Sequence, residues 1–278
     1  MSVTVVTDSA ACLPADLRER WGIRVAPLHI LLDGADLRDG IDAVPDDIYA
    51  RDHVSTAASS PAELAEIYRA ALEDSAGAGA VAIHISSMLS GTVGNADHVA
   101  AELGGAVRVV DSRSTAMGTG FVALAAARAA AAGADMHTVA TAAEAAVRHC
   151  RAYLVVHQLD NLRRSGRIGS AAAWLGTALS LKPLLAVDDG KLVLAQRIRT
   201  FGKAVTTMIE RVAEAAGERP AALAVHHVAN PHGAQDVAGA LAERLPACAP
   251  AVITSLCPTL ALHVGAGAVA VCVETNPS

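Results

Sequence analysis

The stretch VAIHISSMLSGT, residues 81–92, decides how the chain folds. Its apolar start is typical of a buried strand, and apolar residues then recur at helical spacing from Ala96 to Leu103. The stretch therefore predicts a strand that turns directly into a helix, as in α/β proteins. Hydroxyl side chains gather at the turn, at Ser86, Ser87, Ser90 and Thr92, with Gly91 among them.

The same alternation of short apolar runs and helical patterns continues along all 278 residues. It predicts an α/β fold with mainly parallel sheets flanked by helices. We expect strands at 3–7, 23–31, 80–85, 106–110, 153–157, 183–187, 191–195, 221–227, 251–256 and 268–273. We expect helices near 14–21, 61–74, 91–104, 115–132, 136–149, 170–180, 201–216, 233–245 and 258–264.

The composition changes near Arg151, where an acidic part of the chain gives way to a basic one. We therefore expect two α/β lobes, residues 1–151 and 152–278, with a ligand cleft between them. Two strands of the first lobe, VVTDS (5–9) and VVDS (109–112), end in Asp-Ser. The carboxyl ends of strands are where open α/β sheets place their ligands.

Composition excludes several classes of protein. The net charge of −6 argues against a nucleic-acid partner. The chain opens on a strand and not on a signal peptide, and its most apolar helical stretch is interrupted by Arg128, so no membrane span is expected. The odd number of cysteines and the lack of a CxxC motif favour a reducing cytoplasm. They are Cys12, Cys150, Cys248, Cys257 and Cys272.

A basic block lies in the second half of the chain. The segment from Arg163 to Lys203 contains eight basic residues, and its only acidic residues are Asp188 and Asp189. Such a block is commonly a solvated face, and it can also be a docking face for a partner that handles phosphate.

Motifs of the common enzyme classes are absent. The sequence contains no nucleophile elbow and no P-loop, and GAGAVA (265–270) precedes a strand instead of following one. Neighbouring His226 and His227 would point to opposite faces of a strand, so we expect no metal site there. These absences favour a binding protein that needs no cofactor.

The hydroxyl cluster has two readings. Unpaired amides at the start of the helix near Ser90, together with the hydroxyls, would form a site for a phosphate or carboxylate. Alternatively, Ser90 is only the helix cap and Ser86 and Ser87 are turn residues. Thr56 precedes a separate helix start and is free for a ligand, whereas His263 is either a core residue or a functional one.

Motifs in the order found here resemble the DegV family over nearly the whole chain. They are VTDSAACLP, PLHILLDG with LRDGID, STAASSPAEL, ISSMLSGT, VVDSRSTAMGTG, LDNLRRSGRIG, LKPLL with DGKL, RIRTFGKA and HVGAGAVAV. The resemblance implies a two-lobed fold that holds one long-chain fatty acid, such as a C16–C18 acid, in a buried tunnel. It further implies that a separate fatty acid kinase subunit phosphorylates the bound carboxylate, and it allows a transient contact with a membrane.

The resemblance also assigns residues. Thr56, Ser87 and His263 would hold the carboxylate, Ser86, Ser90, Gly91 and Thr92 would support the head-group loop, and Arg167 and Arg199 would face the kinase. The chain departs from the family pattern at Ala57, Ala58, Ser59, Ala266 and Val269, which puts the loop shape and acyl specificity in question.

Two alternatives remain open. The protein could carry another anionic lipid or small acid without a kinase partner. It could also be an acyl or phosphoryl transfer enzyme that uses Ser87 with His263, although the sequence offers no evident carboxylate to orient that pair.

Overall fold

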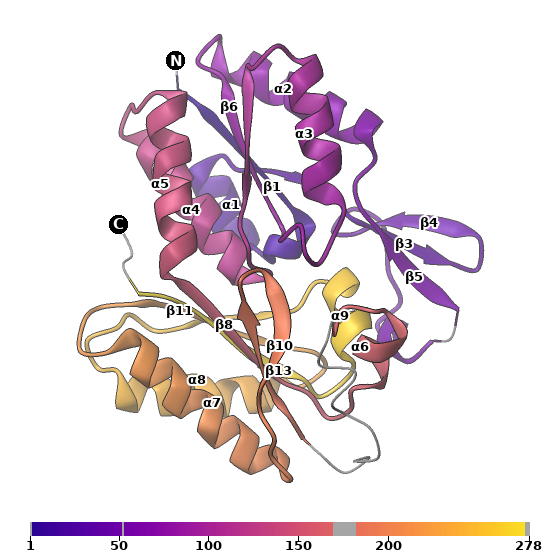
Figure 1. Cartoon of the computed structure of the whole chain (residues 1–278), viewed down its shortest axis with the longest axis vertical. Coiled ribbons are helices and arrows are strands. Elements are labelled where there is room, and N and C mark those ends of the chain that lie inside the picture. The colour runs from indigo at the N-terminus through magenta and orange to yellow at the C-terminus, as the bar shows by residue number, and fades with distance from the viewer. Residues whose placement is uncertain (1, 52, 169–181, 276–278) are drawn as a thin grey trace.

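The computed structural model describes residues 2–51, 53–168 and 182–275. Its strands form two main sheets and one small sheet, and helices pack on both main sheets (Figure 1). We call the four-stranded sheet with its helices the first lobe, and the six-stranded sheet with its helices the second lobe. The α/β class is confirmed. The chain enters the second sheet at Cys150, while the division into two domains at residue 151 stays a prediction.

The first sheet is parallel throughout, in the order β2-β1-β6-β7. Its strands are β1 (Thr4–Asp8), β2 (Arg24–Ala26), β6 (Ala80–His84) and β7 (Val107–Asp111). Its helices are α1 (Ala15–Trp21), α2 (Pro61–Ser75), α3 (Thr92–Glu102), α4 (Met117–Ala131) and α5 (Met136–His149), with a short 3-10 helix η1 (Ser9–Ala11). Alternate residues of β6 serve the two faces: Val81 and Ile83 pack with α4 and α5, whereas Ala80 and Ala82 pack with α2 and α3.

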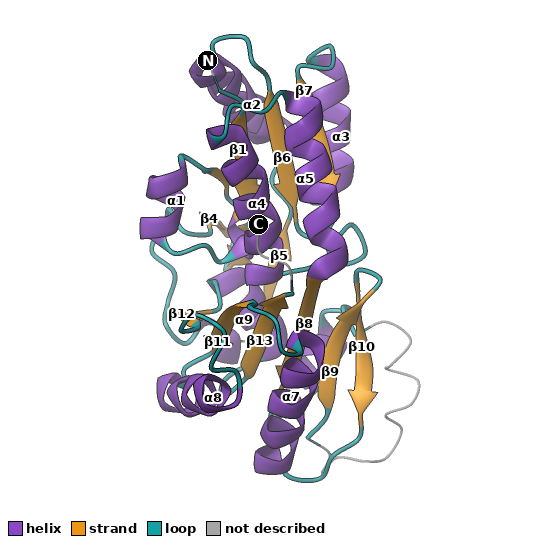
Figure 2. Cartoon of the chain, turned by 90° about the vertical axis from the view of Figure 1, so that its left-hand side faces the viewer, coloured by secondary structure: helices purple, strands orange, loops and turns teal. Residues whose placement is uncertain are grey.

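Helix α4 lies between the two main sheets, and nearly all of its residues are buried. Figure 2 shows α4 and α5 against the first sheet and helices α7 and α8 against the second. Small residues allow this close packing, since a Cβ at Gly118 would collide with the Ser114 hydroxyl. The alanine-rich composition thus serves a helix packed on both sides. Among the described residues, no helix combines the length and apolarity needed to cross a membrane.

The second sheet has the order β10-β9-β8-β13-β11-β12 and is mainly antiparallel, which corrects the expectation of parallel sheets for this lobe. Among its described pairings, β11 with β12 is parallel. Its strands are β8 (Cys150–Val155), β9 (Leu184–Asp188), β10 (Lys191–Gln196), β11 (Ala222–His227), β12 (Val252–Ser255) and β13 (Val269–Glu274). Helices α7 (Phe201–Ala216) and α8 (Pro231–Arg244) cover one face. The sheet is antiparallel because β9 and β10 form a hairpin through Gly190 and because β13 inserts between β8 and β11.

A small antiparallel sheet, in the order β4-β3-β5, was not expected from the sequence in this form. Its strands are β3 (His29–Leu32), β4 (Ala35–Arg38) and β5 (Val54–Ala57), and a 3-10 helix η2 (Ile48–Ala50) lies between β4 and β5. Strands β3 and β5 contact α9 (Pro258–Val264), which in turn contacts α6 (Asp160–Arg164). This packing brings residues from both halves of the chain to one place. The helix expected at 170–180 lies outside the described residues.

Candidate functional site

A largely apolar pocket lies between the two lobes, and its cavity volume is about 140 Å³. One buried water needs only about 10–15 Å³, so the cavity suits a ligand of many atoms. The second lobe supplies apolar walls from β8, β9, β10 and β13, and the first lobe supplies the loops after β6 and β7. Leucines dominate the walls: Leu28, Leu89, Leu154, Leu162, Leu192, Leu256 and Leu260.

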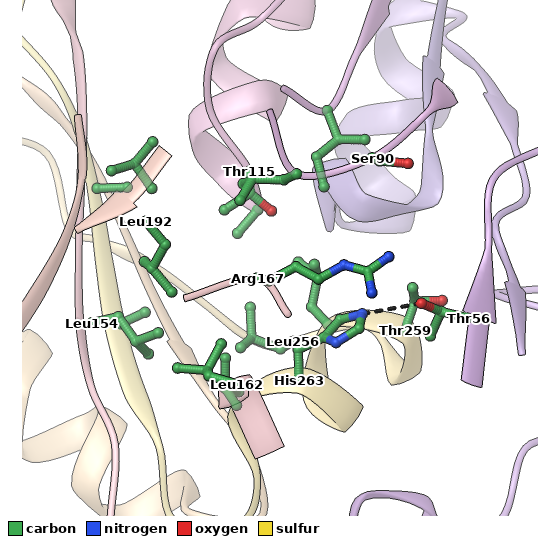
Figure 3. Close-up of a pocket in the computed structure, with 18 of the residues that line it drawn as sticks. Thr56, Ser90, Thr115, Leu154, Leu162, Arg167, Leu192, Leu256, Thr259 and His263 are labelled. Atoms are coloured by element: carbon green, nitrogen blue, oxygen red, sulfur yellow. Dashed lines mark hydrogen bonds between the residues drawn. The ribbon is translucent and has the colours of Figure 1, made fainter. Parts of the chain in front are cut away.

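Polar groups gather at one end of this pocket, where β5 meets α9 (Figure 3). The Thr56 hydroxyl and His263 Nε2 are hydrogen-bonded at 3.1 Å. The Arg167 guanidinium points toward this pair from the loop after α6. Among the described lining residues, Arg167 is the one with a permanent charge. The pocket therefore has an apolar interior and a polar end with a positive charge.

His263 is a neutral imidazole at neutral pH. Burial, and then the positive charge of Arg167, lower its pKa to about 4. An anion placed beside His263 and Arg167 would have the opposite effect on this pKa. The polar end is thus organised for a negatively charged group that can accept hydrogen bonds.

Two further hydroxyls line the pocket and were not identified from the sequence. Thr259 is only 4% exposed, and its hydroxyl has no hydrogen-bond partner. The hydroxyl of Thr115 is likewise unpartnered. Because an unpaired buried hydroxyl is costly, both indicate a ligand with polar atoms. Thr259 precedes His263 by four residues on α9, and this helical spacing was a signal that sequence analysis could have used.

In the turn after β6, some residues line the pocket and others support the fold. Of the residues expected in a head-group loop, Ser90 and Gly91 line the pocket. Ser90 also accepts the Thr92 amide at 3.3 Å and shares a hydrogen bond of 2.9 Å with the Thr92 hydroxyl. Thr92 itself is buried outside the pocket lining, so it supports the position of Ser90.

Ser87 does not occupy the position that the sequence predicted. It is exposed, it lies outside the pocket lining, and its hydroxyl donates to Asp111 Oδ2 at 2.6 Å. Ser90, three residues later, is the serine of this turn that faces the cavity. The strand-to-helix turn directs Ser87 toward the end of β7 instead. The described geometry also gives no contact between Ser87 and His263, which the enzyme alternative required.

Ser86 joins the two lobes. It is fully buried, and its hydroxyl donates to the Gly190 carbonyl at 2.8 Å, at the tip of the β9–β10 hairpin. Beside it, Arg113 of the first lobe pairs with Asp189 of the same tip. Ser86 therefore holds a wall of the pocket in place, whereas its expected role was in the head-group loop.

The aspartate at the end of β1, from the first Asp-Ser pair, also stabilises the fold. Asp8 is fully buried and accepts the Ile85 amide at 2.8 Å. Its Oδ2 lies 3.1 Å from His84 Nδ1, and His84 Nε2 is hydrogen-bonded to the Tyr68 hydroxyl at 2.7 Å. Burial and the charge of Asp8 raise the pKa of Tyr68. All three side chains are shielded from solvent, so this chain of hydrogen bonds fastens β1, β6 and α2 together.

The two arginines expected on the docking face differ. Arg199 is exposed just before α7 and is free of the pocket. Arg167 lines the pocket at its polar end, which corrects its expected position outside the cavity. The glycine at 166, with φ of 72°, turns the chain after α6 so that Arg167 faces inward.

A second hollow reaches the polar end from outside. It shares Thr56, Arg167 and His263 with the apolar pocket. Its remaining lining is mainly polar and includes the cationic residues Arg51 and Arg164. The polar end of the apolar pocket is therefore reached from outside through a hollow that arginines line, of which Arg51 is paired with Asp47.

The departures from the family pattern affect the pocket unequally. Ala57 and Ala58 line it, so their short side chains widen the cavity beside Thr56. Ser59 is buried and donates to the Pro27 carbonyl at 2.5 Å. Ala266 is exposed. Val269 is buried in the core between the second sheet and helices α7 and α8, away from the pocket. Among the described residues, no group of histidine, cysteine and acidic side chains has the arrangement of a metal site.

The model of the DegV family, described as an uncharacterised protein family, matches residues 2–276. A DegV domain-containing protein of Mycobacterium tuberculosis is 65% identical over 278 residues, covering 100% of this chain and 99% of that protein.

Solved structures give the same result. A DegV family protein from Thermus thermophilus, described for its fatty acid binding, has a TM-score of 0.89 and 33% identity, covering 99% of this chain and 100% of that one. DegV from Bacillus subtilis, described as a fatty acid binding protein, has a TM-score of 0.88 and 29% identity, covering 98% and 99%.

Proposed function

Since this chain belongs to the DegV family, we propose that it binds one long-chain fatty acid in the pocket between its lobes. The observation that carries the proposal is an apolar cavity that ends at a Thr56–His263 pair beside Arg167 and an unpartnered Thr259. An acyl chain matches the leucine-lined walls, and a carboxylate matches the polar end. The relatives described as fatty acid binding proteins support the same ligand class.

The acyl tail supplies the affinity. A saturated C16 chain has about 15 carbons beyond its carboxyl, and burial of each CH₂ contributes about 0.8 kcal/mol. The gross driving force is then about 12 kcal/mol, from which loss of ligand freedom subtracts several kcal/mol. The pocket needs no catalytic group to hold such a ligand.

The polar end supplies orientation. Thr56 and Thr259 donate hydroxyl hydrogen bonds to the carboxylate, His263 donates through its N–H, and Arg167 neutralises the charge. These donors are required because a buried carboxylate without partners is strongly unfavourable. Ser90 completes the head-group site, in place of Ser87.

We further propose that the bound carboxylate is presented to a separate kinase subunit, which phosphorylates it with ATP. The second hollow supports this step, because it reaches Thr56 and His263 from the surface and is lined by cations. Arg199 lies outside the lipid pocket and is proposed as a docking residue for the kinase. The protein itself then needs no cofactor, and we propose that it works in the cytoplasm.

The binding proposal is tested by organic extraction of the purified protein followed by mass spectrometry. We expect about one long-chain fatty acid per chain, and the ligand-free protein should melt at a higher temperature when fatty acid is added. The methyl ester should bind more weakly than the acid, because it lacks the charge that Arg167 faces. Recovery of a different lipid acid, or of none together with no thermal shift, would overturn the ligand assignment.

The presentation step is tested with Arg199→Glu and a cognate kinase. Fatty acid binding should stay unchanged, while acyl-phosphate formation should fall, most strongly at low salt where charge steers encounter. Lys191→Glu, a change of the same charge at an exposed site elsewhere in the basic block, serves as the matched control. Unimpaired phosphorylation of Arg199→Glu would contradict the docking role and leave the binding proposal intact.

A further inference from the structure

Two cysteines from opposite ends of the chain meet between the lobes. The Cys257 amide donates to Cys12 Sγ at 3.3 Å, although 245 residues separate them in sequence. Cys12 directly follows η1 in the first lobe, and Cys257 directly precedes α9. Cys257 and Cys12 also influence each other electrostatically, since Cys12 contributes to the raised pKa of Cys257. The contact therefore links the first lobe to the helix that carries His263.

The surroundings of this pair differ from those of a core cysteine. Both residues are partly exposed and line a hollow outside the acyl pocket, which also contains Asp39 and Ser255. Cys150, in contrast, is buried. Cys12 adopts a left-handed backbone conformation with φ of 48°, which is uncommon for a residue other than glycine or asparagine. Small-molecule oxidants can therefore approach the pair without entering the fatty acid pocket.

We propose that Cys12 and Cys257 form a modification site, at which oxidation by a peroxide joins them in a disulfide that fastens α9 to the first lobe. The site is not part of the head-group end and requires no bound lipid. It depends on a contact already present, since the Cys12 sulfur lies against the backbone amide of Cys257.

The chemistry proceeds in two balanced steps. Cys12 first attacks the peroxide: a sulfur–oxygen bond forms, the oxygen–oxygen bond breaks, and Cys12 becomes a sulfenic acid while one water leaves. Cys257 then attacks the Cys12 sulfur. The disulfide bond forms, the sulfur–oxygen bond breaks, and the departing hydroxide takes the Cys257 proton to leave as a second water.

The order of the two sulfurs follows from their environments. Burial, and then the neighbouring Cys12, raise the pKa of Cys257. Cys257 therefore keeps its proton at neutral pH, and we assign it as the resolving thiol. Cys272 is the competing partner to be excluded; it is buried, and burial chiefly raises its pKa to about 12.

The disulfide has a consequence for the acyl pocket. Helix α9 carries Thr259 and His263, and its first turn is already held by the Asp39 carboxylate, which accepts the Thr259 amide at 3.2 Å. A covalent bond at Cys257 adds a second anchor at the same end. Resting on the proposed function, the oxidised protein should exchange fatty acid more slowly than the reduced protein.

The experiment compares reduced protein with protein treated with hydrogen peroxide, without added lipid. Non-reducing peptide mapping should identify a Cys12–Cys257 linkage in the wild type, reversible by dithiothreitol. Because the bond closes a long loop, we expect the melting temperature to rise by about 5 °C on oxidation. Cys248→Ser is the matched control and should keep both effects, whereas Cys12→Ser and Cys257→Ser should lose both.

Specific results would overturn the proposal. These are an unlinked wild type after peroxide treatment, or a Cys12–Cys272 linkage in place of Cys12–Cys257. Should either serine variant fold poorly, the peptide map of the wild type alone still decides the matter. Fatty acid exchange is measured last, with the same two preparations: a linked protein with unchanged exchange would refute the coupling to the pocket, and failure to bind fatty acid at all would count against the proposed function only.

Discussion

His226 and His263 share a low pKa but differ in what surrounds them. Burial is the main cause in both, and each pKa falls to about 4. His226 is completely buried, and its Nε2 accepts the Met117 amide at 3.1 Å, at the start of α4. His263 lines the apolar pocket. There it is hydrogen-bonded to the Thr56 hydroxyl and lies near the charge of Arg167.

The comparison teaches that a shifted pKa does not identify a functional site by itself. His226 must be neutral because its nitrogen accepts a backbone hydrogen bond between the lobes. Burial also favours the neutral form of His263, and the charge of Arg167 lowers its pKa further. What distinguishes His263 is the apolar cavity that it lines. His226 therefore serves stability, whereas His263 is the residue that we propose to bind the carboxylate.

The largest expected effect concerns stability at acid pH. His226 has a pKa of about 4 in the folded protein and 6.5 as its ordinary value. As pH falls below about 6.5, the unfolded chain binds the proton first, so stability is lost between pH 6.5 and 4. The loss attributable to His226 is about 3 kcal/mol, at 1.36 kcal/mol per pKa unit. Denaturation of the wild type and His226→Leu at several pH values measures it.

The role of His226 is measured by the difference between the pH-dependent stabilities of the wild type and His226→Leu. Burial raises the pKa of Glu274 to about 7, so its contribution to stability is present below pH 4.5 and is lost as pH rises through 7, opposite in sign to that of His226. This contribution is common to wild type and variant and cancels between them. His226→Leu should also be less stable at pH 7, because the Met117 amide loses its acceptor. Parallel pH profiles for the two proteins would contradict the role of His226.

The second effect concerns binding. His263→Leu removes a head-group donor and should weaken fatty acid binding by about 1–3 kcal/mol, the usual cost of an unpaired buried polar group, or about 5- to 150-fold. His226→Leu, the same substitution outside the pocket, should bind fatty acid as the wild type does. Isothermal titration with a C16 acid at pH 7 compares them. Equal weakening in both variants would show that the effect is structural.

The smallest effect separates two hydroxyls. Thr259→Val should weaken binding by about 1.5 kcal/mol, the lower end for a hydrogen bond to a charged group, because the carboxylate loses one uncharged donor. Ser87→Ala should leave binding unchanged, because Ser87 is exposed and donates to Asp111. The same titration measures both variants. If Ser87→Ala weakens binding more than Thr259→Val, the assignment of the head-group loop from this geometry is wrong.

The sequence predicted the elements better than their arrangement. Long apolar runs such as 80–85 gave β6, and the capped helix start at Ser60 gave α2, with Ser60 accepting the Glu63 amide. Strands β4 and β5 were missed because each has four residues with few apolar side chains. Strand direction in the second sheet was also missed, because periodicity reports which residues are buried and not which strands are neighbours.

The sequence named residues that the structure brings together, but it did not predict where their side chains point. Thr56 and His263 come from segments 207 residues apart, and the structure places them in hydrogen-bond contact. Ser87 and Ser90 could not be distinguished, because the direction of a side chain in a turn depends on backbone angles that composition does not reveal. Arg167 was expected outside the cavity because the sequence does not show the turn that directs it inward. Thr259, at i−4 from His263, could have been found from helical spacing.

The most direct test of the account is ¹³C NMR of palmitate labelled at its carboxyl carbon and bound to the protein. In the wild type we predict a bound carboxyl resonance that is distinct from free palmitate and remains that of an ionised carboxylate well below the ordinary carboxyl pKa, because Arg167 favours the charged form. His263→Leu should shift this resonance, and His226→Leu should not. A carboxyl resonance that is identical in all three proteins would contradict the claim that the fatty acid head group lies at Thr56 and His263.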